Sequence, residues 1–212
     1  MDDLSVPIVV AGCGPGAPEY VSELVRATVR RAKVIAGAPR LLELFPETSA
    51  MRLPFTGSIE IWLDQLAELR DFPIVVLVSG DPGLCSLASP ILRRFGRRRC
   101  RILPGVSAVQ LACARLGIGW EHMALLHAHA RLPEWSREAL ETADPVVILL
   151  GASGAEVFAA NVARSLSRDC FVCDDLSLAE ECIRRIDYDE LETLPTHPRR
   201  VVVLSREWSK DA

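Results

Sequence analysis

Four apolar segments of this sequence each run into a glycine-containing loop and then into a stretch with helical periodicity. The junctions read AGCGPGAPE from Ala11, VSGDPGL from Val78, LPGVSA from Leu103 and LLGASGAE from Leu149. A continuous apolar run before such a loop is typical of a strand that is covered on both faces. Because strands and helices alternate in this way in both halves of the chain, the sequence predicts an α/β fold. We expect parallel or mixed sheets with helices on their faces.

The same pattern predicts the individual elements. Expected strands are residues 7–11, 33–36, 51–53, 73–80, 101–103, 123–129, 146–150, a segment near residue 171, 182–186 and 201–204. Expected helices are residues 18–32, 41–44, 59–69, 84–95, 107–116, one that begins at residue 133, and 155–166. Pro90 is expected to kink the helix that contains it or to start a new turn. The segment GIGW that begins at Gly117 marks the predicted boundary between two domains, residues 1–117 and 118–212.

Charge and hydrophobicity exclude several classes of protein. The formal net charge of −4 argues against a nucleic-acid binder. The basic run RRFGRRRCR, residues 93–101, is interpreted as a solvated surface at a helix end. No apolar run approaches the ~20 residues that span a bilayer. Residues 1–7 are too short and too acidic for a signal peptide, so we expect a cytoplasmic protein with no membrane association.

The cysteines favour a packing role over metal binding. All seven are scattered through predicted helices and strands, which is unlike a disulfide framework. Cys170 and Cys173 form one C-x-x-C along a predicted strand, and a structural zinc site needs four ligands. We therefore interpret them as buried thiols and expect no metal requirement.

Glycine at the four junctions points to a ligand-binding rim. In parallel α/β sheets, ligands bind outside the carboxyl ends of the strands. Glycine there lets the backbone approach a ligand closely and adopt positive φ. We expect all four glycine loops to lie at the same edge and to form this rim.

A dinucleotide site is one alternative for the first loop. Gly12, Gly14 and Ala17 satisfy the G-x-G-x-x-G/A spacing of NAD(P)-dependent oxidoreductases. Such a fold places an acidic residue after the second strand to hold a ribose, yet residues 36–37 are Ala-Gly. The two prolines of the loop also remove backbone N–H donors that would hold a pyrophosphate.

Three motifs taken together resemble a known family. GCGPGAPEYVS resembles the opening G-x-G-P-G-x-P of the tetrapyrrole (corrin/porphyrin) methylases, and VSGDPGL resembles their G-D-P loop. LPGVSAVQLACARLGIGW is similar to their P-G-[IV]-S-[SA] segment and the helix that follows. Within the family, GAPRLLELFP and PGVSAVQLACARLGIGW look most like the precorrin-6Y/precorrin-7 branch of cobalamin biosynthesis, whose enzyme methylates carbon 5 of the macrocycle. The C-terminal half matches more loosely.

The resemblance implies two α/β domains, parallel or mixed sheets, and S-adenosylmethionine bound in a cleft between the domains, usually in a homodimer. Matched by motif, the implied donor-binding positions are Pro15, Ser79, Gly80, Asp81, Leu84, Ser107, Ala108 and Leu150. Leu176 corresponds to a later adenine contact, although CDDLSLAEE lacks the expected small residue. Asp81 has two open readings, as a ligand of the donor's polar atoms or as a turn residue.

The resemblance also suggests where a tetrapyrrole would bind. HAHAR, residues 127–131, stands where related enzymes show Ser-x-His-Gly-Arg, so His129 and Arg131 match while His127 and Ala130 depart. Arg131 is a candidate carboxylate clamp and His129 a candidate for substrate binding or proton transfer. These two are the catalytic candidates, and with Gly14 and Gly16 they are the candidate substrate-binding residues.

The leading interpretation is therefore a precorrin C5-methyltransferase, with three alternatives left open. Other branches of the family act on uroporphyrinogen III, other precorrins, ribosomal RNA or a modified histidine. An oxidoreductase and a non-catalytic partner domain are the others. Some members of the branch are fused to a second methyltransferase that methylates carbon 15 and removes a carboxyl group. The chain is thus expected to be either a stand-alone enzyme or a fragment of such a fusion.

Overall fold

The computed structural model describes residues 8–206, so the first residue of the expected strand 7–11 lies outside it. The chain divides into two compact units, Met1–Ser107 and Ala108–Ala212. Each unit is described by itself. The expected domain boundary at Gly117 would leave the helix before that glycine in the first half, whereas this division groups it with the second.

Unit 1 is built on a parallel sheet of five strands in the order β3-β2-β4-β1-β5. The strands are β1 (Ile8–Gly12), β2 (Val34–Gly37), β3 (Met51–Pro54), β4 (Ile74–Val78) and β5 (Cys100–Leu103). All five residues of β4 and all four of β2 are buried, as expected for strands covered on both faces. The sequence predicted every one of these strands to within a few residues.

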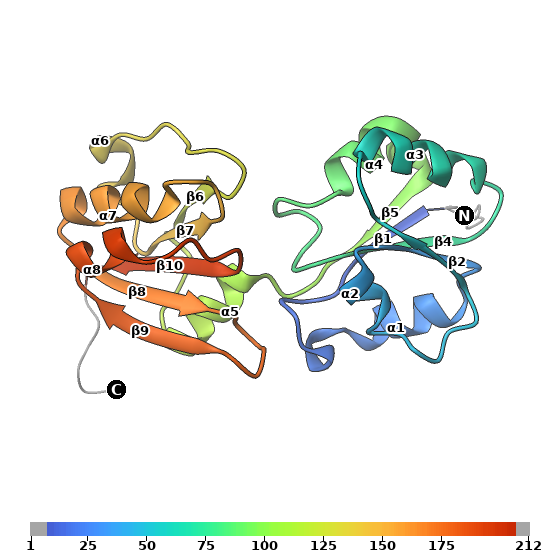
Figure 1. Ribbon diagram of the computed structural model, residues 1–212, viewed down its shortest axis with the longest axis horizontal. Coiled ribbons are helices and arrows are strands. Elements are labelled where there is room, and N and C mark those ends of the chain that lie inside the picture. Colours follow the sequence, from blue (N-terminus) through green and yellow to red (C-terminus); the bar gives the residue numbers. More distant parts are fainter. Residues whose placement is uncertain (1–7, 207–212) are drawn as a thin grey trace. The chain divides into compact units, whose positions relative to one another are not determined.

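Helices cover both faces of this sheet (Figure 1). They are α1 (Glu23–Arg30), α2 (Pro39–Leu42), α3 (Ile59–Glu68) and α4 (Ala88–Phe95), with the 3-10 turns η1 (Pro18–Tyr20) and η2 (Arg97–Arg99). Apolar side chains of α1 and α2 form one core cluster with the sheet, and those of α3 and α4 form another on the opposite face.

Two helix starts differ from the prediction for local reasons. Pro18 begins the separate turn η1, and α1 starts after Ser22, whose Oγ accepts a hydrogen bond from Val25 N. Helix α4 starts at Ala88, so Pro90 lies in its first turn. The first turn of a helix lacks intrahelical acceptors for its N–H groups, so proline costs no hydrogen bond there. Of the two expectations for Pro90, a kink or the start of a new turn, the structure agrees with the second.

Unit 2 is built on a mixed sheet in the order β6-β7-β10-β8-β9. Its strands are β6 (Ala124–Ala128), β7 (Val146–Leu150), β8 (Asp169–Asp174), β9 (Cys182–Ile186) and β10 (Arg200–Ser205). Only the β6–β7 pair is parallel; β10 lies antiparallel between β7 and β8. The last strand of the chain is therefore central in this sheet.

The helices of unit 2 are α5 (Ala108–Leu116), α6 (Arg137–Leu140), α7 (Ala155–Leu166) and α8 (Tyr188–Thr193). Helix α7 packs on the sheet face that carries Ile148, Val172 and Val202, and α5 packs against β10. Helix α8 was not expected from the sequence, and α6 begins at Arg137, not at residue 133. Within residues 8–206, no helix is long and apolar enough to cross a membrane.

Candidate functional site

Three glycine loops of unit 1 meet because β1 lies between β4 and β5. Gly12 pairs with Val78 and Ala11 with Leu103, so the three strands end at the same level. The loops then continue the contact beyond the sheet: Cys13 N donates to Val78 O at 2.8 Å, and Gly80 N donates to Gly14 O at 2.7 Å. The first, second and third motifs of the sequence therefore form one assembly at the carboxyl edge of this sheet.

Two glycines allow this close approach. A Cβ on Gly12 would lie 2.6 Å from Gly80 O and 2.7 Å from Gly105 N, and a Cβ on Gly105 would lie 2.4 Å from Gly80 O. These neighbours are backbone atoms that cannot rotate away. The glycines are thus required because backbone packs directly on backbone.

Asp81 joins the second loop to the third. Its Oδ1 accepts a hydrogen bond from Gly83 N at 2.7 Å and its Oδ2 accepts one from Gly105 N at 3.0 Å. The first bond is the turn interaction expected of an Asp-Pro loop. The second reaches across to the P-G-V-S-A segment, a role that the sequence did not suggest. Asp81 therefore fixes the distance between the two loops.

The predicted donor-binding positions in this half differ in exposure. Ser79 is exposed, Pro15, Gly80, Asp81 and Leu84 are half-buried, and Ser107 is buried. Gly80 has φ +64, and a Cβ there would meet only Ser107 Cα, at 3.7 Å. The space beside Gly80 would therefore hold a small group in ordinary contact with Ser107. Of the two glycines predicted to bind substrate, Gly14 is buried and Gly16 half-buried.

The fourth glycine loop belongs to the other sheet. It follows β7 in unit 2, so the expectation that all four loops share one edge is wrong. Chain order alone could not separate the two sheets. This loop lies at the carboxyl ends of β6 and β7 in the unit 2 sheet, where Ala128 pairs with Leu150. Ala108 also falls in unit 2, as the first residue of α5.

His129 is held by the backbone of β7. Its Nδ1 lies 3.0 Å from Leu150 O, and since a carbonyl only accepts, Nδ1 carries the proton of the neutral ring. Nε2 then presents a lone pair. A Cβ on Gly151 would lie 2.2 Å from His129 Nδ1, so the imidazole occupies the space that a side chain at position 151 would fill. The sequence predicted His129 as a candidate but gave no reason for Gly151.

His127 lies two residues before His129, within β6. The two histidine rings are stacked with centroids 6.2 Å apart. His127 Nε2 is buried without a hydrogen-bond partner. Burial, and then the proximity of His129, lower the pKa of His127, so this ring stays neutral near pH 7. Arg131 lies in the exposed loop after β6.

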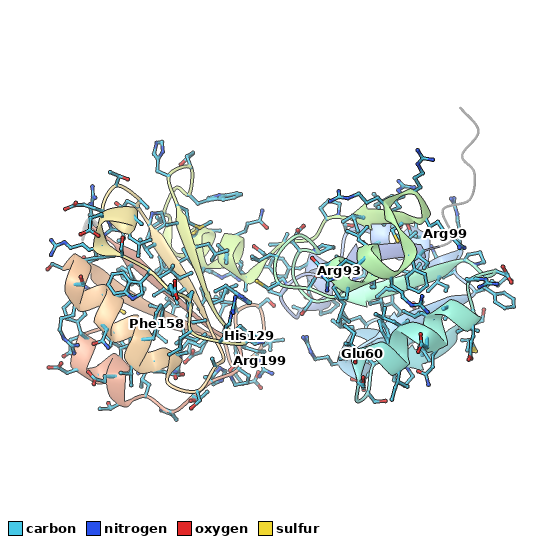
Figure 2. The ribbon with its side chains drawn as sticks, turned by 90° about the horizontal axis from the view of Figure 1, so that it is seen from above. Glu60, Arg93, Arg99, His129, Phe158 and Arg199 are labelled. Carbon is cyan, nitrogen blue, oxygen red and sulfur yellow. The ribbon has the colours of Figure 1, made fainter. Side chains whose placement is uncertain are left out.

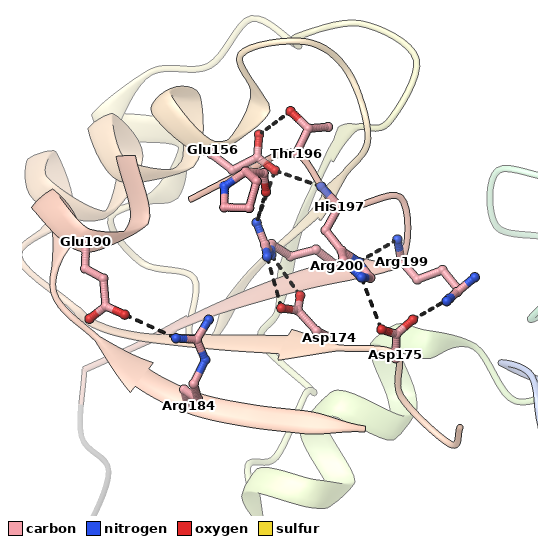
Figure 3. Close-up of polar contacts among 10 residues, drawn as sticks. Glu156, Asp174, Asp175, Arg184, Glu190, Thr196, His197, Arg199 and Arg200 are labelled. Carbon is pink, nitrogen blue, oxygen red and sulfur yellow. Dashed lines mark hydrogen bonds and ion pairs between the residues drawn. The ribbon is translucent and has the colours of Figure 1, made fainter. Parts of the chain in front are cut away.

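A buried polar network at the same edge of this sheet was missed by the sequence analysis (Figure 3). Arg200 is buried and donates to both oxygens of Asp174, at 2.8 and 3.0 Å, and to Glu156 at 3.3 Å. Asp175 is also buried and accepts from Arg199 Nε at 2.5 Å. Removing one partner of a buried pair costs about 3–5 kcal/mol, so this network fixes the loops that it joins.

The loop after β8 has unusual backbone geometry. Asp175 has φ +51 and Ser177 φ +74, a region that residues other than glycine rarely adopt. Glu181 holds this loop by accepting from Ser177 N at 2.6 Å and from Arg115 Nε at 2.7 Å. Leu176, the candidate adenine contact, is buried inside the loop. Such strain gathers at functional sites.

The structure offers no metal-binding cluster in the part of the chain that it describes. No group of three His, Cys, Asp or Glu side chains is suitably placed among residues 8–206. Cys170 and Cys173 lie on β8 as expected, and both are buried and free. Burial raises the pKa of each thiol to about 12.

Fold and site together define a two-unit α/β protein in which three glycine loops assemble at the carboxyl edge of the unit 1 sheet. The sequence model of the tetrapyrrole (corrin/porphyrin) methylases matches residues 7–192. The chain belongs to this family, and the predicted α/β fold class is confirmed.

Two curated relatives with named activities are similar to part of this chain. The cobalt-precorrin-7 C(5)-methyltransferase of Salmonella typhimurium is 35% identical over 124 residues, 58% of this chain and 62% of the relative. The precorrin-6Y C(5,15)-methyltransferase [decarboxylating] of Mycobacterium tuberculosis is 38% identical over 115 residues, 52% of this chain and 28% of the relative. The matched part thus spans less than two thirds of the first and under a third of the second.

Solved structures share the fold over nearly the whole chain. The precorrin-6Y methylase of Archaeoglobus fulgidus is 25% identical with a TM-score of 0.72, covering 95% of this chain and 99% of the other. The uroporphyrin-III C-methyl transferase of Thermus thermophilus, complexed with S-adenyl homocysteine, is 18% identical with a TM-score of 0.74. The match covers 93% of this chain and 96% of that one.

Proposed function

We propose that this protein is an S-adenosylmethionine-dependent methyltransferase that methylates carbon 5 of a late precorrin in cobalamin biosynthesis. The observation that carries the proposal is the assembly of three family motifs into one set of loops, held by Gly12, Gly105 and Asp81. The names of the relatives supply the reaction: a C(5)-methyltransferase and a C(5,15)-methyltransferase.

The residues of the assembled loops fit a ligand that needs shape more than charge. Ser79 is exposed and Gly80 has no side chain, so this part of the second loop leaves room for a ligand, although Gly80 N–H is already donated to Gly14 O. We assign donor binding to the positions matched by motif, which are Pro15, Ser79, Gly80, Asp81, Leu84, Ser107, Ala108 and Leu150. Asp81 acts there chiefly by positioning Gly83 and Gly105, because both its oxygens already accept backbone hydrogen bonds.

The bound donor supplies an electrophilic methyl group for in-line displacement by an electron-rich macrocycle carbon. Alignment by the protein contributes as much as roughly 7–11 kcal/mol in such reactions. Replacing a hydrogen on carbon by a methyl group releases one proton. His129 accepts it on Nε2, since Nδ1–H is committed to Leu150 O. Arg131 binds a carboxylate of the tetrapyrrole, and Gly14 and Gly16 line the approach of the macrocycle.

The remaining proposals concern the location, oligomeric state, partners and domains of the protein. The protein acts in the cytoplasm as a homodimer on a small-molecule tetrapyrrole, without a metal of its own, nucleic acid or membrane. A methyltransferase for carbon 15 that also decarboxylates works beside it, separately or fused, as the name of the mycobacterial relative suggests. Residues 1–117 and 118–212 serve as its two domains.

The test is label transfer from S-adenosylmethionine to a panel of precorrins, with and without cobalt, followed by the absorbance of the pigment. We expect label on a late precorrin and none on uroporphyrinogen III. The reverse result would overturn the branch assignment. In a thermal-shift assay, S-adenosylhomocysteine at 100 times its Kd should add about 2.7 kcal/mol to the unfolding free energy. NAD should add nothing, and stabilisation by NAD alone would instead support an oxidoreductase.

A further inference from the structure

Four residues form a row across one face of the unit 2 sheet, just beyond the strand ends. Asp174 pairs with Arg200, Val201 with Leu149, and Ala128 with Leu150. Extending the β8–β10 and β6–β7 ladders by one residue, and the β7–β10 ladder by two, places Asp175, Arg199, Gly151 and His129 side by side. Side chains alternate along a strand, so all four lie on the face opposite to Ala128, Leu150 and Val202. Figure 2 shows Arg199 and His129 at the same end of this unit.

Arg199 is oriented by a buried carboxylate. Its Nε donates to Asp175 Oδ1 at 2.5 Å, and the Asp175 side chain is only 10% exposed whereas that of Arg199 is 48% exposed. Asp175 N also donates to Arg199 O at 3.3 Å, which ties the two backbones together. Within residues 8–206, the ion pair of Arg199 uses Nε alone. The two terminal nitrogens therefore stay available at the exposed end of a fixed side chain.

His197 completes the support for Asp175 without competing for the ligand. Its Nδ1 accepts a hydrogen bond from Arg199 N at 3.3 Å, so the proton of the neutral ring is on Nε2. That Nε2–H lies 3.1 Å from Asp175 Oδ2. Both oxygens of Asp175 are thus occupied by donors from the segment that precedes β10 (Figure 3). The strained φ of Asp175 is maintained by these contacts.

We propose that Arg199 binds a carboxylate of the ligand at this edge, on the His129 side of the row. The planar guanidinium fork matches a carboxylate in a bidentate geometry, and Asp175 has already fixed the fork. Gly151 keeps the position between Arg199 and His129 free of a side chain of its own. The inference rests on the proposed methyl transfer. Two carboxylate sources are then available: the side chains of the tetrapyrrole and the amino-acid part of the donor.

The test compares Arg199→Met with Arg184→Met in the full chain. Arg184 also forms an exposed ion pair in this unit, with Glu190 at 3.2 Å and 40% side-chain exposure, but it lies in β9 (Figure 3). Methionine keeps the aliphatic stem and removes the charge in both variants. A third variant, Arg199→Lys, keeps the positive charge but lacks the planar guanidinium group. Thermal unfolding of every variant first shows that it is folded.

Three probes separate the two sources. S-adenosylhomocysteine carries the amino-acid carboxylate, 5′-methylthioadenosine shares its thioether nucleoside without that carboxylate, and the precorrin carries the macrocycle carboxylates. Calorimetry gives Kd for the first two, and initial rates give KM for the third. Losing a charged hydrogen-bonding partner should weaken the affected ligand by about 10- to 100-fold.

Each outcome has a defined meaning. If Arg199→Met weakens S-adenosylhomocysteine but not 5′-methylthioadenosine, the proposal holds and the donor is the source. If both bind normally but KM for the precorrin rises, the proposal holds and the tetrapyrrole is the source, with partial recovery in Arg199→Lys. Unchanged binding and KM, or an equal loss for all three probes, would overturn the proposal. Failure of the wild type to transfer methyl groups would instead refute the proposed function.

Discussion

Replacing Gly151 by alanine tests whether the fixed position of His129 matters. The new Cβ would lie 2.2 Å from His129 Nδ1 and 2.8 Å from its Cε1, so the imidazole must move away. The ring then loses its hydrogen bond to Leu150 O, and Nε2 no longer has a defined direction. The backbone at Gly151 does not have positive φ, so alanine itself is compatible with the local conformation.

The effect on stability should be small, because two terms oppose each other. Losing one hydrogen bond of an exposed side chain costs about 0.5–1.5 kcal/mol. Replacing glycine by alanine in a compatible conformation gains about 0.4–1 kcal/mol by restricting the unfolded chain. We therefore expect an unfolding free energy within about 1 kcal/mol of the wild type. The methyl-transfer rate should fall by about 100-fold or more, since a positioned general base contributes at least that much.

The assay combines urea unfolding with the rate of label transfer at saturating substrates. Gly117→Ala is the matched control: Gly117 has φ +65 at the end of α5, and its Cβ would meet nothing within 4 Å. Alanine in that left-handed conformation costs about 1–2 kcal/mol, without touching His129. Gly117→Ala should thus be less stable than Gly151→Ala but keep its methyl-transfer activity, whereas Gly151→Ala should lose most of that activity.

Full activity of Gly151→Ala would refute this reasoning. It would show that the direction of the His129 ring is irrelevant and that the proton leaves by another route. Equal losses of rate in both glycine variants would also count against it, because the rate would then follow stability alone.

Three further predictions follow from single contacts. Gly12→Ala should destabilise the protein by about 3 kcal/mol and abolish S-adenosylhomocysteine binding in calorimetry, since backbone of two other loops lies under 3 Å from the new Cβ. His127 has a lowered pKa in the folded state, so the unfolded chain binds more protons and stability falls as the pH drops below about 6.5. Between pH 7.5 and 5.5, the melting temperature of His127→Leu should therefore fall less than that of the wild type. A thiol reagent should modify the exposed Cys85 and Cys182 of the native protein before Cys13, whose burial raises its pKa to about 12.

The sequence predicted the strands of unit 1 well because each signal is local. An apolar run such as residues 74–78 carries its own evidence of burial, and a glycine loop marks its end. Helix α8 was missed for the converse reason. It has six residues, of which only Leu191 is buried, so it shows no apolar periodicity, and it depends on the cap that Asp187 gives to Glu190 N.

The buried network of unit 2 could not be predicted, because it depends on sheet order. Glu156, Asp174 and Arg200 are far apart in the sequence, and each alone reads as an ordinary surface charge. They meet only because β10 returns antiparallel between β7 and β8, and no local pattern specifies that insertion. The row that contains Arg199 has the same origin.

Sheet order also explains why the first loop matches a dinucleotide motif without serving that purpose. In the common dinucleotide-binding order 3-2-1-4-5-6, the first strand lies beside the second, and the loop glycines let a pyrophosphate approach the backbone. Here β1 lies between β4 and β5, and the space beside Gly12 is filled by Gly80 O and Gly105 N. The same spacing therefore serves a contact between loops, and the two prolines remove N–H groups that this contact does not use. The neighbours of a glycine motif decide its function, and in this chain those neighbours are the two other motifs of the family.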